Sequence, residues 1–194
     1  ETGTGVTPDP AAALQLYRTA AEAGSQDAMI NLAITLLEGS GGAQEVEDAV
    51  ALLKRASAEG SSKATYNLGV LAQDGRIDTP RDALDYFTRA ARDGAREGYL
   101  AAAILLDEGR GVERDPDRAA VMLLRGAAED RGDVLRQLTD NADQWSRDTI
   151  AAVQERLQAA GYYTSTIDGL PGRNFSAALA QWRNGGFVAE VLVN

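Results

Sequence analysis

The chain has 194 residues, a formal net charge of -10 at pH 7, and no cysteine or histidine. This composition excludes disulfides, nucleophilic sites of the Ser-His-Asp and Cys-His types, and the usual zinc sites. The acidic balance argues against nucleic-acid binding, which needs a clustered positive surface. Apolar residues make up 44% of the chain, yet no run approaches the roughly 18 apolar residues of a membrane span.

The sequence begins with a polar, glycine-rich segment over residues 1–8 that is predicted to be disordered. Residues 9–24 then predict an amphipathic helix in which Ala13 and Ala20 lie seven positions apart. This helix has the pattern of the second helix of a hairpin, and its first helix is missing. We therefore expect the chain to be a piece of a larger protein, and its preference for Arg over Lys suggests a GC-rich bacterial source.

Three copies of a helical hairpin follow, over residues 28–63, 64–97 and 98–133. In the central copy the first helix ends at Gly75, Pro80 opens the second helix and Gly94 stops it. The glycines that end the three first helices, Gly39, Gly75 and Gly109, are separated by 36 and 34 residues. A hairpin of this size cannot bury its apolar face alone, so the copies are expected to stack.

The repeated pattern carries a family resemblance. The run ATYNLG at residues 64–69 and the loop GRGVERD at 109–115 resemble Sel1-like repeats, relatives of the tetratricopeptide repeats. The resemblance spans residues 9–133. It implies an all-α solenoid of helical hairpins over residues 9–145, in which residues 134–141 begin a fourth first helix that is cut short.

A second resemblance lies in the C-terminal segment, residues 146–194. Ser146 is expected to cap a helix that runs to about Ala160. The stretch 149–183, with the run IDGLPG at 167–172, is similar to the peptidoglycan-binding-like module of bacterial cell-wall proteins, although the third helix of that family is absent.

This resemblance implies a groove that binds a cell-wall ligand, and the residues expected to touch the ligand are Tyr162, Tyr163, Asp168, Arg173 and Trp182. The alternative is a helical capping unit that covers the apolar end of the solenoid. The tail from Phe187 to Val193 is expected to form a strand or an extended arm.

By analogy with tetratricopeptide repeats, a partner is expected on the concave face that the first helices line. The outward positions there are apolar in the middle and acidic at one edge, which suits a peptide with apolar anchors and a basic flank. They are Ile30, Asn31, Ile34, Tyr66, Asn67, Val70, Gln73, Asp74, Leu100, Ile104, Asp107 and Glu108.

Each kind of position on this face has an alternative interpretation. Apolar residues such as Ile30, Tyr66 and Leu100 would instead pack between adjacent helices. The asparagines would bond to a neighbouring loop instead of a peptide backbone. The acidic residues have no expected packing role. At Gly69, as at Ala33 and Ala103, the small residue is expected to let the second helix approach closely.

The carboxylate pairs give no sign of catalysis or metal binding. Asp107 and Glu108 lie at a helix end without a pocket that would raise a pKa. The acidic runs at 115–117 and 140–143 lack the calcium-loop pattern. We therefore expect no catalytic residue, no cofactor and no metal site.

The leading hypothesis is a non-enzymatic scaffold that binds a protein or peptide on its concave face. The alternatives are a cell-envelope module that binds peptidoglycan, and an accessory interaction region of a larger bacterial enzyme. The sequence does not identify the compartment, and a periplasmic or cell-envelope location is slightly favoured over a cytoplasmic one.

Overall fold

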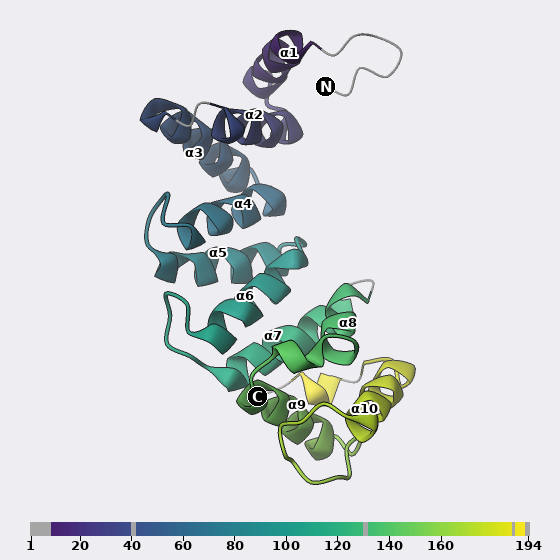
Figure 1. Ribbon diagram of the computed structural model, residues 1–194. Helices are drawn as coiled ribbons and strands as arrows, with labels where there is room; N and C mark the ends of the chain where they lie inside the picture. Colours follow the sequence, from purple (N-terminus) through teal and green to yellow (C-terminus); the bar gives the residue numbers. More distant parts are fainter. Residues whose placement is uncertain (1–8, 40–41, 130–131, 188, 193–194) are drawn as a thin grey trace. The chain divides into compact units, whose positions relative to one another are not determined.

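The computed structural model describes residues 9–39, 42–129, 132–187 and 189–192 (Figure 1). Within these residues the chain forms ten α-helices, two short 3-10 turns and no strand, so the predicted all-α class is confirmed. None of the helices in this described part is long and apolar enough to cross a membrane. Residues 1–8, predicted to be disordered, lie outside the described residues. The chain divides into two compact units, Glu1–Ala95 and Arg96–Asn194.

The first unit contains one lone helix and two hairpins. Its helices are α1 (Pro10–Glu22), α2 (Gln26–Glu38), α3 (Ala43–Ala58), α4 (Ser62–Gln73) and α5 (Pro80–Arg92). Helix α1 begins where Asp9 Oδ1 accepts a hydrogen bond from the Ala12 N–H at 2.9 Å, and α5 begins at a proline that suits the first helical position. The hairpins α2/α3 and α4/α5 correspond to the first two predicted copies.

The two helices of the central hairpin approach closely at one glycine. A Cβ atom built on Gly69 would lie 2.7 Å from the Phe87 ring, which is itself fully buried. Gly69 therefore leaves the space that the ring of the second helix fills. The predicted role of the small residue at this position is confirmed.

The second unit contains the third hairpin and the C-terminal segment. Its helices are α6 (Glu97–Glu108), α7 (Pro116–Glu129), α8 (Asp133–Thr139), α9 (Arg147–Ala159) and α10 (Arg173–Asn184), with 3-10 turns at Ala142–Gln144 and Ala189–Val191. Helix α7 packs against α6, α8 and α9. The short α8 matches the predicted truncated helix, and Ser146 caps α9 by accepting from the Thr149 N–H at 3.3 Å.

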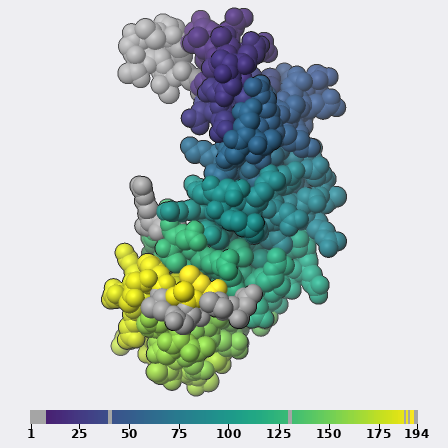
Figure 2. All heavy atoms as spheres, turned by 180° about the vertical axis from the view of Figure 1, so that it is seen from behind, coloured from purple at the N-terminus to yellow at the C-terminus, as the bar shows by residue number. Residues whose placement is uncertain are grey.

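The last described residues correct one expectation. A strand or extended arm was expected after Phe187, but residues 189–191 form a 3-10 turn and Val191 is fully buried. The turn contacts α9 of its own unit, and in the view from behind the yellow C-terminal residues lie beside the green ones of that unit (Figure 2). Residues 188, 193 and 194 of the expected arm lie outside the described residues. The predicted domain boundary after residue 145 falls inside the second unit and stays a prediction.

Candidate functional site

The first helices of the first unit, α2 and α4, begin in the same register. Ser25 and Ser61 each accept a hydrogen bond from a backbone N–H three residues later, at 3.3 and 3.4 Å. Because these caps are 36 residues apart, each predicted partner-binding position on α2 has a counterpart on α4. The pairs are Ile30 with Tyr66, Asn31 with Asn67, and Ile34 with Val70, and the same spacing places Glu38 opposite the predicted Asp74 in the repeat pattern.

Two of these pairs lie at the surface. Ile34 and Val70 are half-buried, and Glu38 and Asp74 are exposed. Among the described residues, neither of these two carboxylates takes part in an ion pair. Each first helix of this unit therefore presents a β-branched apolar side chain about one turn before an exposed carboxylate.

The other apolar pair packs inside its hairpins. Ile30 is only 7% exposed. The ring of Tyr66 is half-buried and lies 5.3 Å from the Phe87 ring, centroid to centroid, at an angle of 47°. The packing interpretation therefore describes Ile30 and the Tyr66 ring better than the partner-binding one.

The polar positions on these helices differ in their contacts. Asn67 Nδ2 donates a hydrogen bond to the Lys63 carbonyl, one turn earlier in the same helix, at 2.9 Å. This amide group therefore bonds within its own helix. Asn31 is exposed and Gln73 is half-buried, so both reach the surface.

In the second unit, α6 repeats part of this pattern. Leu100 and Ile104 are half-buried. Glu108 is exposed and forms an ion pair with Arg110 at 2.6 Å. The acidic end of α6 is thus partly neutralised by a neighbouring arginine.

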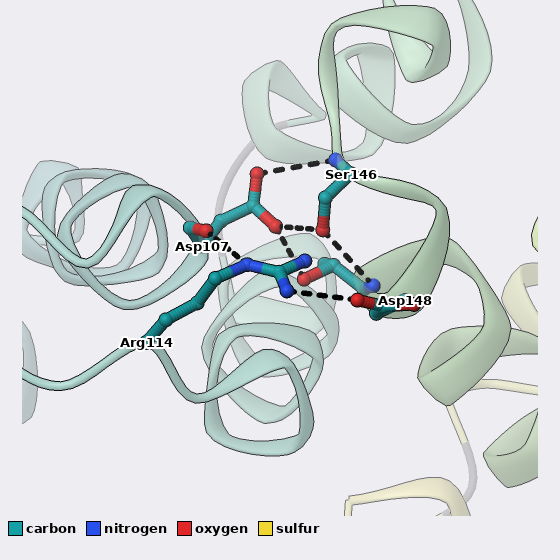
Figure 3. Close-up of polar contacts among 5 residues, drawn as sticks. Asp107, Arg114, Ser146 and Asp148 are labelled. Atoms are coloured by element: carbon teal, nitrogen blue, oxygen red, sulfur yellow. Dashed lines mark hydrogen bonds and ion pairs between the residues drawn. The ribbon is translucent and has the colours of Figure 1, made fainter.

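Asp107 has a role that corrects the prediction. It was expected to be an acidic residue of the concave face without a packing role, but it is only 8% exposed. Its carboxylate accepts hydrogen bonds from the Ser146 N–H at 3.1 Å, from the Ser146 hydroxyl, and from the Thr149 hydroxyl at 2.6 Å. Figure 3 shows this carboxylate directed at the beginning of α9. Asp107 therefore joins the third hairpin to the C-terminal helices.

Arg114 strengthens the same junction. Its Nε donates to the Asp107 carbonyl at 2.9 Å, and its Nη1 pairs with the Asp148 carboxylate at 2.8 Å (Figure 3). A carboxylate near a helix N-terminus also interacts favourably with the helix dipole. The cap at Ser146 was visible in the sequence, but its acidic partner lies 39 residues earlier, where no local pattern marks it.

The residues predicted to contact a cell-wall ligand are not all at the surface. Trp182 is fully buried and packs edge-on against Phe187, with ring centroids 4.8 Å apart, and Tyr163 is only 5% exposed. Tyr162 is half-buried, while Asp168 and Arg173 are exposed. Trp182 and Tyr163 are thus core residues, and Tyr162 alone of the three predicted aromatic residues stays partly exposed.

Gln154, which no sequence motif indicated, organises this region. It is fully buried. Its Oε1 accepts from the N–H groups of Asp168 and Gly169 at 3.1 and 2.9 Å, and its Nε2 lies 3.0 Å from both Asp168 Oδ1 and the Leu170 carbonyl. The one available signal was a long polar side chain on the helix face that carries Ile150, Val153 and Leu157.

The predicted turn at Asp168 is confirmed. Asp168 Oδ1 accepts a hydrogen bond from the Leu170 N–H at 2.9 Å, and this bond, with that from Gln154, lowers the pKa of the carboxyl. Gly169 has φ of +67°, and a Cβ there would lie 2.3 Å from the Arg147 carbonyl oxygen. This position therefore requires glycine for both conformation and space.

A shallow hollow of about 340 Å³ opens beside this turn. It is lined by Tyr163, Ser165, Thr166, Asp168, Leu170, Pro171, Gly172, Arg173, Asn174 and Phe175. Leu170 is 50% exposed at its edge. Elsewhere in the described chain, no group of three or more acidic side chains is placed to hold a metal ion.

Comparisons with known proteins agree with the repeat architecture. The sequence matches the Sel1 repeat at residues 1–25, 26–61, 62–94 and 97–130, which is more than half of the chain. These matches end before the segment that resembled a peptidoglycan-binding-like module. No curated protein matches the sequence.

Two solved structures share the fold. A Sel1 repeat protein from Oxalobacter formigenes is 24% identical with a TM-score of 0.57, and the alignment covers 93% of this chain and 68% of that one. A protective antigen from uropathogenic Escherichia coli, which displays an SLR fold, is 22% identical with a TM-score of 0.62, and the alignment covers 99% of this chain and 44% of that one. This chain thus spans less than half of the length of the antigen. On the repeat matches, the chain belongs to the Sel1 repeat family.

Proposed function

We propose that this chain is a non-catalytic scaffold that binds a protein or peptide on the surface of its first helices. Sel1 repeat proteins are generally scaffolds for protein–protein interaction. The observation that carries the proposal is the repetition of one surface pattern. A half-buried β-branched residue stands at the same register position in all three first helices, as Ile34, Val70 and Ile104, and an exposed acidic residue follows four positions later in each.

The chemistry of these positions defines the partner. Half-buried apolar side chains offer contact area without a deep pocket, as in helix-in-groove or extended-peptide recognition. Glu38 and Asp74 add negative charge at the C-terminal ends of their helices, where it already repels the negative end of the helix dipole. A basic residue in the partner would relieve this repulsion. The expected partner therefore carries apolar anchors beside Lys or Arg.

Site-specific photo-crosslinking tests this placement. A benzophenone amino acid is introduced at Ile34 or at Val70, and for comparison at the exposed Lys54 and Asp85 on the second helices. In extract from the native source, the two first-helix positions should give the same adduct and the second-helix positions should not. Adducts from only the second-helix positions would refute the proposed face.

A second candidate function rests on the hollow beside Asp168. Its exposed polar groups include Arg173 and Asn174, and Leu170 gives it an apolar edge, a combination that suits a sugar–peptide such as peptidoglycan. Sedimentation with purified sacculi tests it. The wild-type chain should sediment and Arg173→Ala should not, while Arg183→Ala, at an exposed position of the same helix, should behave as wild type. Failure of the wild-type chain to sediment would eliminate this candidate.

The third interpretation is that the chain is one region of a larger protein. If the chain is an accessory region of a larger bacterial enzyme, the same first-helix surface would hold the substrate or a regulator of that enzyme. The crosslinking experiment addresses this case without change, because it identifies whatever protein is bound.

A further inference from the structure

The junction between the first two hairpins carries a polar pair where the preceding junction is apolar. Ser57, near the end of α3, and Thr65, near the beginning of α4, have hydroxyl oxygens 2.7 Å apart. Thr65 is only 2% exposed. Ala21 and Met29, which stand 36 positions earlier in α1 and α2, are both buried. An apolar pair therefore fits this register position, and the two hydroxyls need another explanation.

The hydrogen bonds of this pair have a fixed direction. A hydroxyl has one proton to donate. The Thr65 hydroxyl donates its proton to the Ser61 carbonyl, at 3.1 Å. Ser57 therefore donates to Thr65, and its Oγ accepts from Arg89 Nη2, at 2.7 Å. The result is a series of hydrogen bonds that runs from Arg89 of α5 through α3 to the beginning of α4.

Arg89 joins this series instead of pairing with carboxylates beside it. Asp82 and Asp85 line the same hollow as Arg89, of about 420 Å³, but within the described part of the chain neither forms an ion pair with it. The guanidinium lies over the Tyr86 ring, 5.6 Å from the centroid, and Tyr86 donates to Asp78 Oδ2 at 2.9 Å. Arg89 is thus held by an aromatic ring of its own helix and by a hydroxyl of α3.

The corresponding arginine of the preceding junction makes a weaker contact. Arg55 has the register position of Arg89, since each precedes a fully buried alanine of its helix. Arg55 Nη1 lies 3.5 Å from the Ala21 carbonyl oxygen, at the limit of a hydrogen bond, and its Nε pairs with Glu59 at 3.0 Å. As far as the structure describes it, the α1/α2 junction therefore lacks the hydroxyl series of the α3/α4 junction.

Hydrogen bonds hold two helices differently from apolar contacts. A hydrogen bond weakens steeply when its angle or its donor–acceptor distance changes, whereas apolar burial has no direction. Met29 is in addition a flexible side chain of the kind that adapts to irregular gaps. A buried polar group can fix the register of packed elements at a cost in stability, as a buried asparagine does in a coiled coil.

We propose that Ser57, Thr65 and Arg89, which we call the polar lock, fix the position of the second hairpin on the first. The polar lock joins α3, α4 and α5, and α2 packs on α3, so the lock sets the spacing between α2 and α4. These two helices carry Ile34 and Val70. On the proposed first-helix face, on which this consequence rests, the three are positioning residues that set the distance between two partner-binding positions.

Distances between spin labels test the polar lock without a partner, and the absence of native cysteine makes labelling specific. The labels replace the exposed Asp27 and Lys63, at the beginnings of α2 and α4, and a control pair replaces Lys63 and the exposed Arg92 of the same hairpin. In Ser57→Ala/Thr65→Val, electron paramagnetic resonance should show the first distance shifting or broadening by about 1–2 Å, the size of a helix shift at a packed interface. The control distance should not change.

A stability measurement separates the polar lock from ordinary packing. Replacing both partners of a buried hydrogen bond with apolar groups of the same shape is nearly neutral or stabilising. The double variant should therefore keep its thermal midpoint, followed by circular dichroism, at or above that of wild type. A lower midpoint together with an unchanged distance between α2 and α4 would show an ordinary packing contact and would overturn the proposal.

Arg89→Gln tests the outer end of the polar lock at an exposed residue, where the fold does not depend on the side chain. This variant should also change the distance between the labels at Asp27 and Lys63, whereas Arg92→Gln, at another exposed arginine of α5, should leave it as in wild type. An unchanged distance in Arg89→Gln, or an equal change in Arg92→Gln, would overturn the polar lock. Neither result bears on the first-helix face, which the crosslinking experiment tests separately.

Discussion

The buried carboxylate of Asp107 gives the most direct test of how the C-terminal helices are attached to the repeats. Asp107→Ala removes the acceptor of three hydrogen bonds and leaves the donors of Ser146 and Thr149 without it. Hydrogen bonds to a charged group each contribute roughly 1.5–3 kcal/mol. Thr149 is fully buried, but Ser146 is half-buried and can bond to water instead. We expect a loss of about 3 kcal/mol in the free energy of unfolding of the second unit.

Urea denaturation followed by tryptophan fluorescence measures this loss selectively. The two tryptophans of the chain, Trp145 and Trp182, both lie in the second unit. The control is Glu108→Ala, one residue further on, which removes only a surface ion pair to Arg110 and should change stability by less than about 1 kcal/mol. If Asp107→Ala is no more destabilising than Glu108→Ala, the junction does not depend on this carboxylate.

Three further changes test other parts of the structure. Gly69→Val should destabilise the first unit by about 1–3 kcal/mol in thermal unfolding followed by circular dichroism, because the valine side chain would overlap the Phe87 ring. Adding Phe87→Leu should recover part of this loss. A Gly69→Val variant as stable as wild type would contradict the close approach of the two helices. Gln154→Leu should cost about 2–4 kcal/mol in urea denaturation followed by tryptophan fluorescence, since it leaves the buried Gly169 N–H and the part-buried Asp168 N–H without their acceptor. A wild-type midpoint would contradict this role of the amide. The hydrogen bond from the Leu170 N–H lowers the pKa of the Asp168 carboxyl. The contribution of the ionised carboxylate to stability is therefore complete above 3.8, the ordinary pKa of Asp, and is lost as the pH falls through the lowered pKa. Asp168→Asn should remove this acid-sensitive part, and an NMR titration with a carboxyl pKa at or above 3.8 would refute the shift.

The repeats could be predicted because their signals are local. Helix starts such as Pro80 and stop signals such as Gly75 act within a few residues of the structure that they determine, and the small residue at Gly69 acts within its own hairpin. The hairpins, their boundaries and the tight packing of Phe87 on Gly69 therefore follow from short stretches of sequence.

The junction and the C-terminal unit could not be predicted in the same way. Asp107 and Glu108 are neighbouring acidic residues, and the sequence gives no sign of which one is buried. Only the fold places Asp107 against α9 and leaves Glu108 in solvent. Gln154 acts on residues 14 to 16 positions away. Trp182 was assigned to a ligand surface because of the resemblance to a peptidoglycan-binding-like module, but the side chain is fully buried in the core of this segment.

The first-helix surface is the central claim, and the affinity of the protein captured by crosslinking tests it most directly. Val70→Glu places a charge at the β-branched position of a first helix, while Ala51→Glu makes the same kind of change at an exposed position of a second helix. Calorimetric titration should show Val70→Glu binding at least about tenfold more weakly than wild type, with Ala51→Glu within about twofold. Equal affinities for Val70→Glu and wild type would contradict the assignment of partner binding to the first helices.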